Sequence, residues 1–205
     1  MAADEKEDIS NTVRVMRCFV STAIGAMKLL PRLLAVLLLS ILLIGKCVGY
    51  VRLTNLKCES LDPAFMEFPT CRLNVLGRGI IGGNIHLKLL KVPITKMNLR
   101  FNVYRRLSGY HPFLFNISTE LCRFMKNPNP LQVFYYFHSG FLPYSNVNHT
   151  CPYTDDVFIR NCTLNDEMFK RVPLPKGNYM LTLAMDNGAR KRVGIISIYI
   201  EIDLD

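Results

Sequence analysis

The chain has 205 residues, of which 50% are hydrophobic and 20% charged, and 25 Lys plus Arg against 16 Asp plus Glu give a formal net charge of +9. This hydrophobic content excludes a disordered chain, and 12 Gly and 11 Pro without a repeating period exclude a fibrous protein. The length suits one domain, or one domain and a processed segment.

An apolar run near the N-terminus predicts the compartment. Residues 33–45 contain no charge and have basic residues on both sides. A membrane span needs about 20 apolar residues, so this shorter run is typical of a signal peptide, with cleavage expected before Tyr50. Residues 1–49 are therefore predicted to be an N-terminal extension plus signal peptide, and residues 50–205 a single secreted domain. The alternative is a single-pass signal anchor, which also leaves residues 50–205 outside the cell because the basic flank favours a cytosolic N-terminus.

Cysteines and sequons agree with an extracellular location. Five Cys lie beyond residue 49, so one thiol is left over when the others pair. Pairing nearest neighbours predicts Cys58 with Cys71 and Cys122 with Cys151, and a link from Cys58 to Cys162 would overturn that scheme. An oxidising compartment favours disulfides over metal sites, and no C-x-x-C pair occurs, so we predict no metal. Sequons predict glycosylation at Asn116, Asn148 and Asn161.

Alternating hydrophobicity predicts strands over most of the expected domain. Residues 97–103 alternate with period 2, as do residues 85–89, and the stretch around Pro93 is interpreted as the turn of a hairpin between them. Two C-terminal stretches alternate on either side of a turn signal at Asp186-Asn187-Gly188. Further strands are expected at 51–58, 70–76, 112–118 and 156–160. Seven or eight short strands predict an antiparallel sandwich.

One stretch breaks the strand pattern. Leu131, Phe134, Tyr135 and His138 follow the spacing i, i+3, i+4, i+7 after Pro130. This spacing favours a short helix near 131–141 that lies across the mouth of the sandwich. The high aromatic content also suits a strand, which is the alternative.

No motif points to catalysis. Residues 77–82 match G-x-G-x-x-G, but a strand pattern follows where a dinucleotide site needs a helix, so we interpret the glycines as a loop between strands. His86 is interpreted as solvated and Asp155-Asp156 as a solvated turn. No nucleophile and base occur at a usable spacing, so we predict no enzyme and no cofactor. The secretory address argues against nucleic acid as the partner of the basic residues.

Phe and Leu side chains form the candidate ligand site. In a closed sandwich they would be core, whereas between splayed sheets they would line an apolar pocket. Each methylene of a ligand buried there is worth about 0.8 kcal/mol. The candidate lining residues are Phe101, Val103, Phe113, Phe115, Phe134, Phe137, Leu181 and Leu183.

Several motifs occur together in a known family. They include Leu53-Thr-Asn-Leu-Lys-Cys58, Lys88-Leu-Leu-Lys-Val-Pro93, Cys122-Arg-Phe-Met-Lys-Asn-Pro128 and Pro173-Leu-Pro-Lys-Gly-Asn-Tyr179. Over roughly residues 53–200 the chain resembles a secreted domain-of-unknown-function family that is expanded in flies. That family is distantly similar to ML lipid-recognition domains and to ganglioside-activator-like chemosensory B proteins. The four Cys of the predicted pairs match its pattern, and Cys162 does not.

The resemblance implies an immunoglobulin-like (ML-type) β-sandwich with a lipid or other hydrophobic small molecule between its sheets, and it links some relatives to gustatory or pheromone detection. We therefore expect a secreted, non-enzymatic binding protein with a chemosensory role. The alternative is an extracellular interaction module with a solid core that binds a membrane receptor or channel. A cavity of ligand size, roughly 300 Å³ or more, separates the two.

Overall fold

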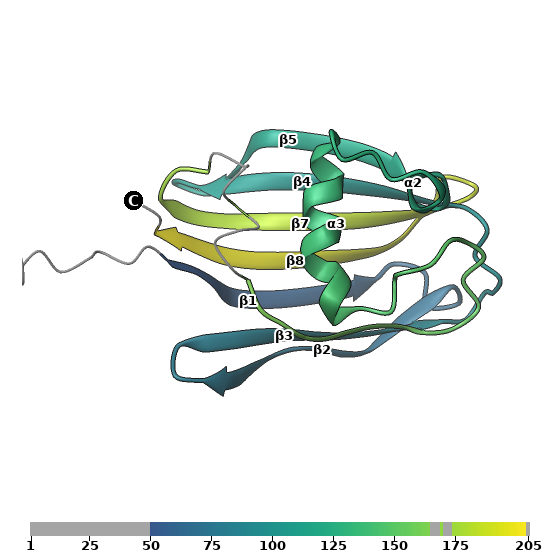
Figure 1. Cartoon of the computed structure of the whole chain (residues 1–205), viewed down its shortest axis with the longest axis horizontal. Helices are drawn as coiled ribbons and strands as arrows, with labels where there is room; N and C mark the ends of the chain where they lie inside the picture. The colour runs from purple at the N-terminus through teal and green to yellow at the C-terminus, as the bar shows by residue number, and fades with distance from the viewer. Residues whose placement is uncertain (1–49, 165–168, 170–173, 204–205) are drawn as a thin grey trace, which may run out of the picture. The chain divides into compact units, whose positions relative to one another are not determined.

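Two antiparallel sheets form the domain, and they confirm the predicted all-β sandwich (Figure 1). The computed structural model describes residues 50–164, 169 and 174–203, so the predicted extension and signal peptide lie outside the described residues. The larger sheet has the order β1-β8-β7-β4-β5 and the smaller one the order β2-β3-β6. The strands are β1 (Tyr50–Ser60), β2 (Met66–Gly77), β3 (Ile80–Leu89), β4 (Met97–Arg106), β5 (Tyr110–Glu120), β6 (Val157–Cys162), β7 (Gly177–Asn187) and β8 (Arg192–Asp203).

Period-2 patterning in β4 and β7 builds the inner face of the larger sheet. Phe101 and Val103 of β4 are 5% and 1% exposed, and they lie opposite Leu183 and Leu181 of β7. The predicted C-terminal hairpin is confirmed, because β7 pairs with β8 around residues 188–191. Its turn is closed by the Asn187 N–H, which donates to the Lys191 carbonyl at 2.9 Å.

The predicted hairpin between residues 85–89 and 97–103 is wrong. These residues lie in β3 and β4, which belong to different sheets. The connection between them crosses from one sheet to the other, and Ile94 within it exchanges two main-chain hydrogen bonds with Tyr153, of 2.8 and 3.0 Å. Each strand forms its main-chain hydrogen bonds with other neighbours: β3 pairs with β2 and β6, and β4 pairs with β5 and β7. Period 2 therefore identified the strands and their inner faces but not their partners.

The smaller sheet lies beside β1 and is tied to it (Figure 1). A disulfide between Cys58 of β1 and Cys71 of β2 makes this link, as predicted. The glycine-rich motif forms the turn between β2 and β3. Gly79 has φ of +74° there, a conformation that favours glycine, so the motif is a tight turn and not a phosphate loop.

Two helices follow β5, and one of them was expected. The helix predicted near 131–141 is confirmed as α3 (Val133–Phe141), which continues into the 3-10 turn η1 (Leu142–Tyr144). Helix α2 (Leu121–Lys126) was not predicted. It begins after Glu120, whose carboxylate accepts from the N–H groups of Cys122 and Arg123 at 3.1 and 2.7 Å and so satisfies two unpaired donors of the first turn.

The second predicted disulfide holds this helical region. Cys122 in α2 is bonded to Cys151, and α3 lies within the loop that the bond closes. Figure 1 shows α3 lying across the strands of the larger sheet. The second layer therefore consists of the smaller sheet and α3 together. No helix in the described part of the chain is long and apolar enough to cross a bilayer.

Candidate functional site

An apolar cavity of about 190 Å³ lies between the larger sheet, the smaller sheet and α3. Every strand except β5 contributes to its wall, as do α2, α3 and the chain between η1 and β6. This volume limits the size of ligand that the cavity can hold. It exceeds the roughly 150 Å³ of a dry cavity that binds benzene and is smaller than the roughly 300–1,000 Å³ of drug-sized ligand sites.

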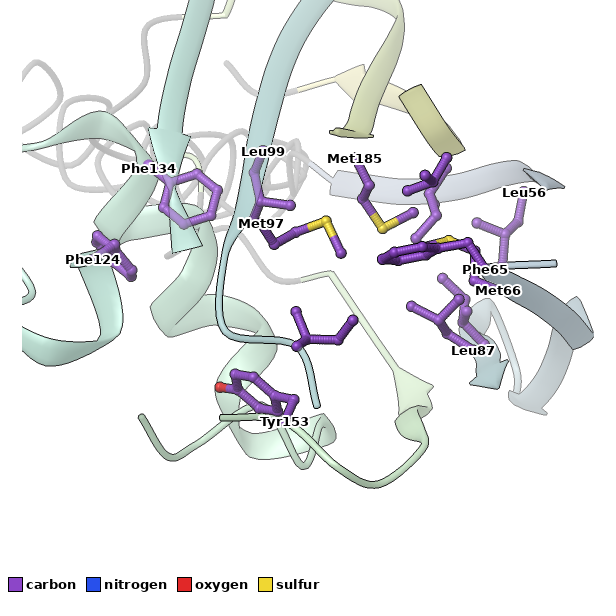
Figure 2. Packing of buried hydrophobic residues seen from close by; sticks show 14 residues of the cluster. Leu56, Phe65, Met66, Leu87, Met97, Leu99, Phe124, Phe134, Tyr153 and Met185 are labelled. Carbon is purple, nitrogen blue, oxygen red and sulfur yellow. The ribbon is translucent and has the colours of Figure 1, made fainter. Parts of the chain in front are cut away.

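The cavity separates two hydrophobic clusters. One cluster contains residues of β2, β3 and both helices, and Figure 2 shows its members Phe65, Met66 and Met185 packed together. The other contains β4, β7 and β8 residues with Phe137 of α3. Leu183 and Ile198 contact both clusters yet stay only partly buried in the middle of their strands. Both residues line the cavity, so part of their inner surface faces empty space, whereas protein interiors usually fill such space.

Five of the eight candidate lining residues lie on the cavity wall. They are Phe101, Phe134, Phe137, Leu181 and Leu183. The structure brings them together from β4, α3 and β7, and their role as ligand contacts stays a prediction.

The other three candidates lie away from the wall. Val103 is 1% exposed and packs within the cluster of β4, β7 and β8. Phe113 and Phe115 lie on the edge strand β5 and are only partly buried beside that cluster. The Phe113 ring contacts the ring of Tyr179 at 5.8 Å and lies under the guanidinium of Arg105. Strand β5 therefore adds to the rim of the core and contributes no residue to the cavity wall.

Most of the wall is aliphatic and was not named from the sequence. The alternation of β3 and β8 already placed their Ile and Leu side chains on one face. Period 2 gives the direction of a side chain, however, and not whether the opposite layer touches it. The additional apolar wall residues of β1, β3, β6 and β8 include Leu53, Leu56, Ile85, Leu87, Val157, Ile159, Ile196 and Ile198.

Helix α3 supplies the aromatic side of the wall. The Phe137 ring lies 4.3 Å from the ring of Phe101, which fastens the helix to β4. One turn earlier, Phe134 contacts Phe124 of α2 edge-on at 4.9 Å. Aromatic pairs of this kind add about 0.5–1.5 kcal/mol beyond their buried area. The two helices are therefore held as one unit over the cavity.

Polar side chains on the described wall are few, and three of them form hydrogen bonds within the protein. The Tyr153 hydroxyl donates to the His149 carbonyl. The Ser145 hydroxyl accepts from the Val147 N–H at 3.4 Å, and His138 Nε2 lies 3.4 Å from the Val147 carbonyl. No Asp, Glu, Lys or Arg is among the described residues that line the cavity.

Cys162 is a free, buried cysteine on the same wall. It is 4% exposed, and burial raises the pKa of its thiol to about 11. The thiol is therefore protonated at neutral pH, and a thiol is a poor nucleophile compared with the thiolate. Within the described ranges, no three His, Cys, Asp or Glu side chains gather in a way that could hold a metal ion.

His138 is expected to make folding pH-dependent. Burial lowers the pKa of His138 from its ordinary value near 6.5, and the hydrogen bond to Val147 opposes this only in part. Stability is fully present above the unfolded pKa. It falls as the pH drops below about 6.5, because the unfolded chain then takes up a proton that the folded chain does not. In thermal unfolding experiments, the melting temperature should therefore fall less between pH 7.5 and pH 5 for His138→Leu than for the wild type. The exposed His111 provides the control. If His111→Gln reduced the pH-dependent loss of stability as much as His138→Leu does, burial of His138 would not be its cause.

His86 and Asp156 lie outside the cavity and are partly exposed, as their interpretation as solvated residues expects, but that interpretation missed the pair that they form. His86 Nε2 lies 2.8 Å from Asp156 Oδ2, and the imidazole stacks on Phe158 at 4.4 Å. Asp156 also accepts from the Leu89 N–H at 3.2 Å. The hydrogen bond from His86 is the main cause that lowers the pKa of Asp156. The pair joins β3 to the start of β6 and is structural.

A polar recess of about 300 Å³ lies beside the ends of β4 and β5. Its buried carboxylate, Asp186, is bound by Arg100 and Arg192, each at 3.0 Å. Both carboxylate oxygens are therefore already engaged by protein groups. We assign no ligand to this recess.

Comparisons with known proteins found a family model and solved structures that are similar to this chain. The family model described as "Protein of unknown function (DUF1091)" matches residues 99–181, which span β4 to β7. No curated protein matches the chain. Among solved structures, the chain is similar to chicken MD-1, solved in complex with lipid IVa, with 15% identity and a TM-score of 0.36. The alignment covers 77% of this chain and 100% of MD-1.

Proposed function

We propose that residues 50–205 form a non-enzymatic binding protein for a lipid or other small hydrophobic ligand. The observation that carries this proposal is the cavity of about 190 Å³, whose described wall is almost wholly hydrocarbon. A cavity so lined does not hold water well, because a buried water needs two to four polar partners. Each methylene that enters gains about 0.8 kcal/mol by leaving water.

The groups on the wall favour binding over catalysis. The Cys162 thiol is protonated at neutral pH, since burial raises its pKa to about 11. The imidazole of His138 is directed to a main-chain carbonyl. Neither group is prepared to transfer a proton or attack a substrate.

A direct ligand search tests the proposal. The full chain is expressed in insect cells, purified from the compartment where it accumulates, and analysed by native mass spectrometry and by organic extraction. We expect a hydrophobic molecule bound in a 1:1 ratio, or uptake of added 1-octanol measured by calorimetry. Protein that carries no ligand and takes up none of a series of apolar compounds would contradict the proposal.

We also propose that the domain is secreted and glycosylated, with a chemosensory role as its biological setting. The two disulfides suit an oxidising compartment. All three sequon residues, Asn116, Asn148 and Asn161, are exposed, as glycosylation requires.

Glycosidase treatment checks the sequons. Peptide-N-glycosidase digestion of the wild type should lower the mass by three glycans, and Asn116→Gln and Asn148→Gln should each start with one glycan fewer. Asn161 is less suitable for substitution because it has φ of +49°, a region where Asn is favoured. A wild type whose mass does not change on digestion would contradict this proposal.

One observation favours the second candidate function, an extracellular interaction module that binds a receptor or channel. The cavity is smaller than the roughly 300 Å³ at which drug-sized ligand sites begin. In that case the space is a packing defect and the surface carries the activity. The calorimetric titration separates the two functions, because a packing defect that takes up no added compound leaves the interaction module as the better explanation.

A further inference from the structure

We propose that the ligand is a single uncharged apolar chain, such as a hydrocarbon, alcohol, aldehyde or ester, and not a fatty carboxylate or a lipid with several acyl chains. This inference rests on the proposed function and names the class of ligand for the same cavity. Three features of the wall carry it: its lack of charge, the engagement of its polar atoms, and its volume.

No charged side chain faces the cavity among the described residues. In β4 the charge lies on the other face, since Arg100 stands between the wall residues Leu99 and Phe101 and binds Asp186 at 3.0 Å. In β3, Lys88 likewise alternates with the wall residues Leu87 and Leu89. A carboxylate drawn into this space would be a buried, unpaired charge, which is strongly unfavourable.

The Tyr153, Ser145 and His138 side chains that reach the wall already have hydrogen-bond partners. The Tyr153 hydroxyl donates to a main-chain carbonyl, and the Ser145 hydroxyl accepts from a main-chain N–H. Burial lowers the pKa of His138 and so disfavours the protonated imidazole that could balance an anion. A neutral ligand loses nothing by this arrangement, whereas a charged head group finds no opposite charge among the described wall residues.

The volume restricts the number of chains. A cavity of about 190 Å³, somewhat larger than the roughly 150 Å³ of one that binds benzene, accommodates one short chain. A second acyl chain attached to the same head group has to stay outside, where its apolar surface remains in water and gains nothing. A double-chain lipid therefore has no advantage over a single chain.

Matched ligands that differ in one property test the inference. The full chain is titrated calorimetrically at pH 8 with 1-octanol, sodium octanoate, octyltrimethylammonium and dioctanoyl phosphatidylcholine. We expect 1-octanol to bind at least tenfold more tightly than the other three. Octanoate or the two-chain lipid binding as tightly as 1-octanol overturns the inference but leaves the proposed function intact. If none of the four binds, the proposed function fails and the inference fails with it.

The titrations are repeated with a variant to place binding in the cavity. Leu183→Trp puts a bulky side chain on the wall, and Met180→Trp makes a comparable change on the opposite face of the same strand. We expect Leu183→Trp to weaken 1-octanol binding at least tenfold and Met180→Trp to leave it within twofold. Equal 1-octanol binding by the two variants contradicts a ligand within this cavity.

Discussion

Removal of the Cys122–Cys151 disulfide by the paired change Cys122→Ala and Cys151→Ala is expected to lower the free energy of unfolding by about 2–5 kcal/mol. The bond joins residues 29 apart in the sequence, and a loop of that length gains roughly 3–4 kcal/mol from cross-linking in the chain-entropy model. Denaturant unfolding monitored by far-ultraviolet circular dichroism measures this change.

The same pair of changes is expected to weaken ligand binding. The closed loop contains all of α3, which contributes Phe134, Phe137 and His138 to the cavity wall. Loss of the cross-link lets local opening of the helical region compete with binding, since such opening costs less than global unfolding. The result is checked by titration of 1-octanol under conditions where both proteins are folded.

Cys162→Ala is the matched control, because this cysteine is buried and free. It should cost about 1 kcal/mol, the usual size for a single substitution, and should keep the pattern of disulfides unchanged in non-reducing peptide maps. A double variant no less stable than Cys162→Ala would contradict the stabilising role of the Cys122–Cys151 bond.

Most of the strands could be predicted because period 2 is a local property. The face formed by Leu99, Phe101 and Val103 was correct, since alternation alone decides which side chains a half-buried strand turns inward. The partner of each strand is not local. Residues 85–89 and 97–103 are close in sequence and have a proline between them, which matches a hairpin, yet the chain crosses to the other sheet. The isolated bridge between Ile94 and Tyr153 joins residues 59 positions apart, and no short-range sequence pattern indicates it.

Helix α2 shows a second limit of sequence patterns. It has six residues, too few for an apolar period to be recognised, and an isolated helix of that length is unstable in water. Two tertiary features account for it, the Glu120 cap and the burial of Phe124 at 4% exposure. The longer α3 was predictable because its aromatic residues recur over two turns.

The candidate site was predictable in composition and less so in position. The aromatic residues of α3 and β4 were identified because apolar side chains from a helix and a strand are expected to be buried where the two elements face each other. Leu183 and Ile198 show what the sequence cannot provide. They lie among similar aliphatic residues of their strands. They belong to the cavity wall and not to the core because the opposite layer leaves a space above them. A cavity is a property of two surfaces, and a pattern along one strand describes one of them.

Leu183→Trp is expected to fill the cavity and abolish most ligand binding with a modest change in stability. Leu183 contacts both hydrophobic clusters and keeps free inner surface, so an indole has space that a fully packed position would not offer. If the indole occupies the space of two methylene groups of the ligand, the binding free energy falls by about 1.6 kcal/mol. This loss corresponds to a roughly tenfold weaker affinity. Overpacking costs about 1–3 kcal/mol where the added atoms do not fit, so the free energy of unfolding should fall by no more than this.

The contrast with Leu181, a more deeply buried residue of the same cavity wall, makes the experiment decisive. Leu181 is 3% exposed and two residues away on the same face of β7, so Leu181→Trp has less space to occupy and should be the more destabilising of the two. Chemical denaturation of both variants measures this difference, and 1-octanol titration measures the binding. A Leu183→Trp protein that is as destabilised as Leu181→Trp would mean that the space over Leu183 is closed in solution. The ligand-binding function would then lose its structural basis, because the wall that carries it would be ordinary core.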